Sequence, residues 1–139
     1  MIKEFSKAWA ENEKRLEKKI GEDLEENEDV WCPWGYEDLL KLVINEVINP
    51  YISGKLSTNG ITTITTGSYQ GTYIYIIPTD SWPMHPKNFV RTYVSYGSCC
   101  ECDALLAATG VKDYKNLCLH LLQHMEYMDY AKQLEEGGK

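Results

Sequence analysis

Cysteine and histidine residues at short spacings are the first feature of this sequence that could do chemistry. Cys99 and Cys102 have the Cys-x-x-Cys spacing, which lets two thiolates on a turn bind the same metal ion. His120 and His124 lie four residues apart, so on a helix both side chains project from one side. Together the four residues match the ligand types of a zinc centre, and one interpretation is therefore a zinc-stabilised domain.

The same cysteines allow two other interpretations. A thiol at the start of a helix has a lowered pKa, and Cys102 with a nearby histidine base would then be a nucleophilic or redox centre. Alternatively, the small thiols fill a tight corner between a strand and a helix. Ser98 or Asp103 would then cap the N-terminus of that helix. We favour the packed corner, since no protease, transferase or thioredoxin-like pattern surrounds the cysteines. We therefore expect a protein without catalysis, and zinc is the one cofactor that the sequence suggests.

Two polar loops are candidates for binding a small ligand. Ser68, Tyr69 and Gln70 lie between two glycines, and His85 lies in a second loop with two prolines. A glycine-rich loop can surround a phosphate, but this one lacks the lysine and the following helix of a P-loop. A hairpin turn is the simpler interpretation, and a nucleotide-binding sponge is the alternative.

Acidic and aromatic residues are candidates for binding a protein. The net charge is −7, which argues against direct binding of nucleic acid, because that requires a basic surface. An acidic run can imitate the phosphates of nucleic acid against a basic cleft. The run consists of Glu22, Asp23, Glu25, Glu26, Glu28 and Asp29. The tryptophans Trp9, Trp31, Trp34 and Trp82 would either contact a partner or cover the edge of the core.

Hydrophobic periodicity and turn residues predict the elements that position these side chains. Helical patterns cover residues 2–28, 36–48, 102–108 and 112–134. Strand patterns cover residues 61–66, 72–78 and 89–96, which are joined by turns. The predicted fold is α+β, with a small antiparallel β-meander of three or more strands packed by N- and C-terminal helices.

The length of 139 residues fits one domain, with a charged helical extension over 1–30 and a single α+β domain over 31–139. The extension has a thin apolar seam, which should dock on its own domain or on a partner. No apolar run approaches the roughly 20 residues that span a bilayer. We expect no membrane contact, a location in the cytoplasm, and a homo-oligomer as one alternative assembly.

Three segments, GSYQGTYIYIIP, YVSYGSCCECDALLAA and LCLHLLQHM, together resemble a family of small bacteriophage and prophage proteins. The resemblance covers roughly residues 67 to 128, and its YGSCxxCD motif contains Gly97, Ser98, Cys99, Cys102 and Asp103. This chain has Cys100 and Glu101 where that family has small residues, and it has His124 where that family has a basic residue. The family has no assigned activity, so the resemblance implies a genomic context rather than a mechanism.

These observations lead to one principal hypothesis. The chain would be a phage-encoded accessory protein that binds and inhibits a host bacterial protein without catalysis, as anti-CRISPR and other anti-defence inhibitors do. The nucleotide sponge and the zinc-stabilised domain are the two alternatives.

Overall fold

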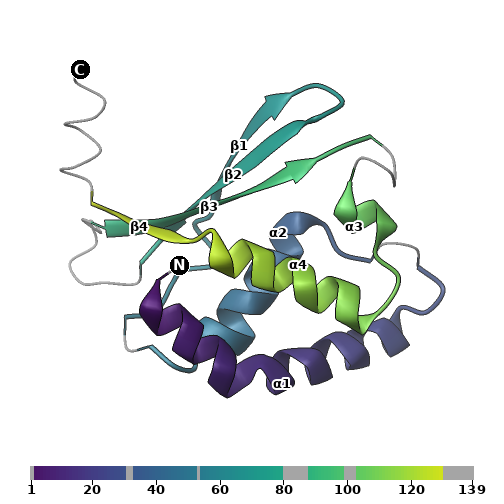
Figure 1. Cartoon of the computed structure of the whole chain (residues 1–139), viewed down its shortest axis with the longest axis horizontal. Helices are drawn as coiled ribbons and strands as arrows, with labels where there is room; N and C mark the ends of the chain where they lie inside the picture. The colour runs from purple at the N-terminus through teal and green to yellow at the C-terminus, as the bar shows by residue number, and fades with distance from the viewer. Residues whose placement is uncertain (1, 31–32, 53, 80–87, 99–102, 130–139) are drawn as a thin grey trace.

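A computed structural model describes residues 2–30, 33–52, 54–79, 88–98 and 103–129 of the chain (Figure 1). Within these residues, helices and a four-stranded antiparallel sheet confirm the predicted α+β class. The elements in chain order are α1 (Lys3–Glu26), α2 (Tyr36–Val43), the π-helix η1 (Ile44–Ile48), β1 (Thr62–Gly67), β2 (Gly71–Pro78), β3 (Asn88–Tyr96), α3 (Ala104–Ala107), α4 (Val111–Gln123) and β4 (Glu126–Asp129).

The sheet is a meander whose strand order, β1-β2-β3-β4, follows the sequence. Ile64 of β1 pairs with Ile74 of β2, which pairs with Tyr93 of β3, so these three side chains share one face. The opposite face carries Tyr75 and Val90, which are buried beneath the helices. The three predicted strands are confirmed to within one residue at each end.

The fourth strand lies where the sequence pattern predicted the last helix to continue to residue 134. That boundary is wrong, because α4 ends at Gln123 and β4 begins at Glu126. Tyr127 pairs with Val90 on β3, and its ring lies 5.7 Å from the ring of Phe5 on α1. These contacts come from distant parts of the chain, and they outweigh the helical propensity of the segment.

The helices cover one face of the sheet. Helix α4 packs against β3, while α1 packs on η1 and α4 on the side away from the β1–β2 hairpin (Figure 1). Phe5, Ala8, Leu16 and Ile20 of α1 are buried, so the apolar seam docks on its own chain. Residues from both sides of residue 30 thereby form one hydrophobic cluster.

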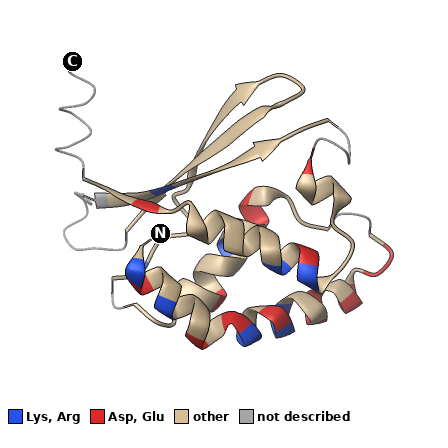
Figure 2. Cartoon of the chain, in the orientation of Figure 1, with Lys and Arg blue, Asp and Glu red and all other residues tan. Residues whose placement is uncertain are grey.

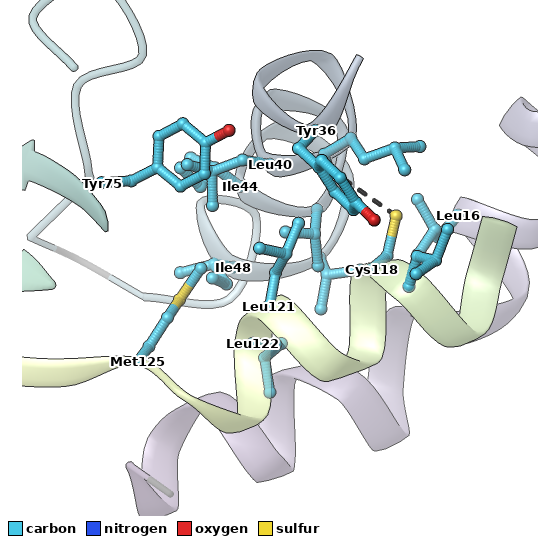
Figure 3. Close-up of a cluster of buried hydrophobic side chains, with 14 of the residues drawn as sticks. Leu16, Tyr36, Leu40, Ile44, Ile48, Tyr75, Cys118, Leu121, Leu122 and Met125 are labelled. Atoms are coloured by element: carbon cyan, nitrogen blue, oxygen red, sulfur yellow. Dashed lines mark hydrogen bonds between the residues drawn. The ribbon is translucent and has the colours of Figure 1, made fainter. Parts of the chain in front are cut away.

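Side chains from α1, α2, η1, α4 and β2 meet in this cluster (Figure 3). Cys118 points from α4 into it, and its Sγ lies 3.6 Å from the carbonyl oxygen of Leu39. Burial raises the pKa of the Cys118 thiol to about 12, so this cysteine is a packing residue that stays neutral at physiological pH.

The β1–β2 hairpin projects beyond the helices (Figure 1), and every residue of β1 is exposed. Gly67 has a φ of 82°, a left-handed conformation that favours glycine. A Cβ atom on Gly71 would overlap the carbonyl oxygen of Thr66. That oxygen accepts a 2.6 Å hydrogen bond from the hydroxyl of Tyr96, whose ring stacks on Tyr73 at 4.2 Å. The predicted hairpin turn is confirmed, and both glycines are required by its geometry.

Candidate functional site

The acidic residues are concentrated in one segment of the chain. Residues 20–40 contain eight acidic residues and no basic one, so the segment carries a charge of −8. The whole chain has a net charge of −7, so all other residues together carry +1. Figure 2 shows acidic residues along the second half of α1 and just beyond it, whereas the β1–β2 hairpin carries no charged residue.

Within this segment the acids differ in their partners. Glu22 lies 3.9 Å from Lys18, and Asp23 lies 3.1 Å from Lys19. A carboxylate oxygen of Glu37 lies 3.7 Å from the Lys41 ammonium, and Asp38 accepts a 2.9 Å hydrogen bond from the backbone N–H of Gly35. The remaining four acids are exposed, and the described part of the chain places no basic side chain within ion-pair distance of them; they are Glu25, Glu26, Glu28 and Asp29.

The position of these acids is unfavourable for the helix. The last turn of α1 contains no basic residue, and the C-terminal end of a helix carries a partial negative charge that repels carboxylates. Each carboxylate near such an end costs roughly 0.3–1 kcal/mol at low ionic strength. The helix end therefore disfavours Glu25 and Glu26, which lie in the last turn of α1, and this favours a role for them outside the fold.

A hollow of about 510 Å³ lies beside the last of these acids. The chain turns after α1, where the backbone N–H of Val30 donates to the carbonyl of Asn27 at 2.9 Å and the Asn27 side chain donates to the carbonyl of Asp23 at 2.8 Å. The turn places Val30 at the surface with 52% of its area exposed. The lining of the hollow consists of Leu24, Asn27, Glu28, Asp29, Val30, Pro33, Ala108, Thr109 and Tyr114.

The hollow thus combines an apolar floor with two carboxylates. Lysine and arginine side chains have an apolar stem and a cationic head, so a surface of this kind suits them. We call residues 22–30, together with this hollow, the acidic hollow.

The aspartate of the YGSCxxCD motif has a structural role next to a second pocket. Asp103 is buried, and its carboxylate accepts hydrogen bonds from the hydroxyl of Tyr36 and, at 3.0 Å each, from the backbone N–H groups of Gly97 and Leu105. The bond to Leu105 caps α3, as predicted for Asp103. Burial raises the pKa of Tyr36, and its hydrogen bond to Asp103 raises that pKa further. The network joins Gly97, at the end of β3, and Leu105, in α3, to Tyr36 of α2.

The second pocket has a volume of about 570 Å³ and lies between β3, α3 and α4. Its floor is apolar, and its polar lining residues are Tyr36, Ser95, Asp113, Asn116 and His120. Among these described lining residues, only Asp113 has a full charge when histidine is neutral. One of its oxygens accepts hydrogen bonds from the backbone and side chain of Thr109. The pocket therefore suits a neutral or cationic molecule better than a phosphate.

His120 and His124 lie together, as their spacing predicted. Their ring centroids are 4.2 Å apart, and Nδ1 of His124 donates to the carbonyl of His120 at 2.8 Å. Burial lowers the pKa of His120, and the neighbouring His124 lowers it further. A neutral imidazole is the form that binds metal. The described residues contain no group of three metal-binding side chains; Cys99 and Cys102 lie outside them, so the zinc site stays a prediction.

The remaining predicted site residues do not gather at one place. Trp9 and Trp34 are partly buried against the core, where Trp34 meets the ring of Tyr114 edge-on at 4.8 Å. Ser68, Tyr69 and Gln70 form the exposed tip of the hairpin. Trp31, Trp82 and His85 lie outside the described residues.

Sequence reasoning missed the apolar part of the acidic hollow and the pocket beside α3. Val30 is an apolar residue that directly follows an acidic run, and this pattern could have marked it as a surface contact. No pattern links Tyr36 to Asp103, because 67 residues separate them. The alanines that line the second pocket look in the sequence like ordinary helix-forming residues.

Comparison with known proteins gives no relative, since no family model, no curated protein and no solved structure matches this chain. No helix among the described residues is long and apolar enough to cross a membrane.

Proposed function

We propose that this chain is a non-catalytic binding protein that engages a basic protein through the acidic hollow. The observation that carries the proposal is the charge of −8 over residues 20–40, which includes exposed carboxylates beside an apolar hollow. In line with the phage resemblance, the partner is a host bacterial protein, and binding would inhibit it in the manner of an anti-defence protein.

Electrostatics supports this choice of partner. Clustered charges of one sign raise the rate of association with an oppositely charged protein and exclude partners of the same sign. Glu25 and Glu26 lie on α1, which packs on the core, and Glu28 and Asp29 lie on the exposed, hydrogen-bonded turn that follows it. The backbone therefore places these acids near one another before the partner arrives. The apolar floor adds a contact that salt does not weaken, which separates a specific site from a general attraction.

The experiment is affinity capture from bacterial lysate with three immobilised proteins: the wild-type chain, Glu28→Gln/Asp29→Asn and Glu4→Gln/Glu11→Gln. Each double variant removes two exposed carboxylates from the N-terminal region, but only the first pair lies at the hollow. We expect a basic protein that the wild type and the Glu4/Glu11 variant retain and the Glu28/Asp29 variant loses. Salt should release it, because the Debye length falls to about 3 Å at 1 M.

Equal loss of the captured protein in both double variants would show that net charge alone attracts it and would overturn the proposal. Capture that does not depend on salt or on Glu28 and Asp29 would also overturn it.

A second candidate function is binding of a small molecule in the pocket between β3, α3 and α4. Its volume lies within the roughly 300–1,000 Å³ of ligand sites, and an apolar floor with a few polar groups is typical of them. The neutral His120 and the single carboxylate favour an uncharged or cationic molecule. A thermal-shift panel of nucleosides, amines and nucleotides tests this: stabilisation by nucleosides or amines that Asn116→Leu removes supports it, and stabilisation by nucleotides alone contradicts it.

A further inference from the structure

Strand β1 is an edge of the sheet, and among the described residues no second strand pairs with its outer side. It is the first strand in the order β1-β2-β3-β4, and all six of its residues are exposed. An unpaired edge presents backbone N–H and C=O groups to solvent and pairs readily with another strand. Soluble proteins commonly protect such edges with charged residues, prolines or bulges.

The residues of β1 itself supply none of those protections. Residues 56–79 contain no Asp, Glu, Lys, Arg or His, so the hairpin is uncharged although the chain carries −7. Pro78 lies at the far end of β2, and β1 itself pairs with β2 residue by residue from Thr62 to Gly67 without a bulge. Figure 2 shows no charged residue on the hairpin itself. The Glu37 carboxylate of α2 lies beside β1, where it accepts a 3.2 Å hydrogen bond from the hydroxyl of Thr63.

The sequence of β1 is symmetric about Ile64. Residues 62–66 read Thr-Thr-Ile-Thr-Thr, and the same residues result when the segment is read backwards. If two copies pair antiparallel around a twofold axis at Ile64, Thr62 faces Thr66, Thr63 faces Thr65, and the two Ile64 side chains face each other. Pairs of threonines and pairs of β-branched residues are favourable across antiparallel strands. No charged side chains of the two β1 strands face each other in this register, because β1 contains none.

The same register also joins the open faces of the two sheets. Ile64, Ile74 and Tyr93 form one row across the face that points away from the helices. Ile64 is 47% exposed and Tyr93 is 45% exposed. In the pair of chains, the row would continue through the second Ile64 to the partner copy's Ile74 and Tyr93. The result is a continuous apolar row in a sheet of twice as many strands.

We propose that two copies of this chain associate through their β1 strands, antiparallel and in register about Ile64. Such an interface is isologous, since each copy contributes the same residues. It leaves the acidic hollow free, because the hollow lies at the end of α1 and the hairpin projects on the other side of the molecule (Figures 1 and 2). The proposal is therefore independent of the proposed function.

The test is sedimentation velocity over a concentration series for the wild type and for Ile64→Lys, Ile64→Glu and Ile74→Lys. The wild type should sediment as a dimer of the 16.0 kDa chain. Ile64→Lys and Ile64→Glu each place like charges opposite each other, and each should weaken the dimer by roughly tenfold or more. Mixing the two variants pairs Lys with Glu at the axis, so a heterodimer should form that neither variant forms with itself.

Ile74→Lys is the matched control, because Ile74 shares the open face with Ile64 but lies on the inner strand β2. Edge pairing predicts that this variant stays dimeric, whereas stacking of the open faces predicts that it becomes a monomer. Circular dichroism spectra equal to that of the wild type show that each variant is folded. A wild type that is monomeric at all concentrations, a monomeric Ile74→Lys, or a Lys–Glu mixture without heterodimer would each overturn the proposal.

Discussion

Replacing Asp103 with alanine should destabilise the protein far more than an ordinary aspartate substitution would. The Asp103 carboxylate is buried and accepts hydrogen bonds from Tyr36, Gly97 and Leu105. Removing an N-cap costs typically about 1 kcal/mol, which accounts for the bond to Leu105. Hydrogen bonds to a charged group contribute about 1.5–3 kcal/mol each. With the lower value for the other two bonds, the expected loss is about 4 kcal/mol.

The assay is chemical denaturation followed by circular dichroism, with Asp113→Ala as the matched control. Asp113 is exposed and accepts hydrogen bonds from the backbone and hydroxyl of Thr109, so its loss should cost only about 1 kcal/mol. Tyr36→Phe removes one of the bonds to Asp103, and the double variant should lose less than the two single variants combined. An Asp103→Ala loss no greater than that of Asp113→Ala would refute the reasoning.

Three further predictions concern the hairpin, the core and the acidic end of α1. Gly71→Ala should lower the free energy of unfolding by about 2 kcal/mol or more in the same denaturation assay, because the new Cβ would overlap the carbonyl oxygen of Thr66 on β1. Gly54→Ala is the control: no atom lies within 4 Å of its new Cβ, so it should change the free energy of unfolding by less than about 0.5 kcal/mol. Burial raises the pKa of the Cys118 thiol from 9.0 to about 12, so its contribution to stability is complete below pH 9 and is lost as pH rises from 9 to about 12. Cys118→Ala should flatten that decline in the free energy of unfolding. An unchanged slope would contradict the assignment of Cys118 as a buried, neutral thiol. Glu25→Gln/Glu26→Gln should raise the free energy of unfolding by roughly 0.3–1 kcal/mol per residue at low ionic strength, and a destabilised variant would mean that these acids support the fold.

The sequence was sufficient to predict the elements that depend on local pattern. The three strands over 61–66, 72–78 and 89–96 have β-branched and aromatic residues between turns, and the structure places them within one residue of those bounds. The helix predicted over 36–48 is continuous but changes to a π-helix at Ile44. There the Asn12 side chain of α1 donates to the carbonyl of Val47 at 3.0 Å. That contact joins residues 35 positions apart, so no local pattern contains it.

The candidate site could be predicted only in part for the same reason. The acidic run is visible in the sequence, and so is the helical spacing that brings His120 and His124 together. The hollow depends on how the turn after α1 meets Ala108 and Tyr114, which are more than 75 residues away. The symmetry of β1 is visible in the sequence as well, but only the strand order shows that this strand lies at an edge.

The most direct test of the proposed function is zero-length cross-linking of the chain in bacterial lysate, followed by mass spectrometry. A carbodiimide activates a carboxylate, and a lysine amine in contact with it then forms an amide bond, so each cross-link reports an ion pair between the two proteins. The account predicts that the cross-links to one basic host protein come mainly from Glu25, Glu26, Glu28 and Asp29. Exposed acids elsewhere, such as Glu4 and Glu11, serve as internal controls in the same sample. Cross-links spread evenly over all exposed carboxylates, or none from the acidic hollow, would contradict it.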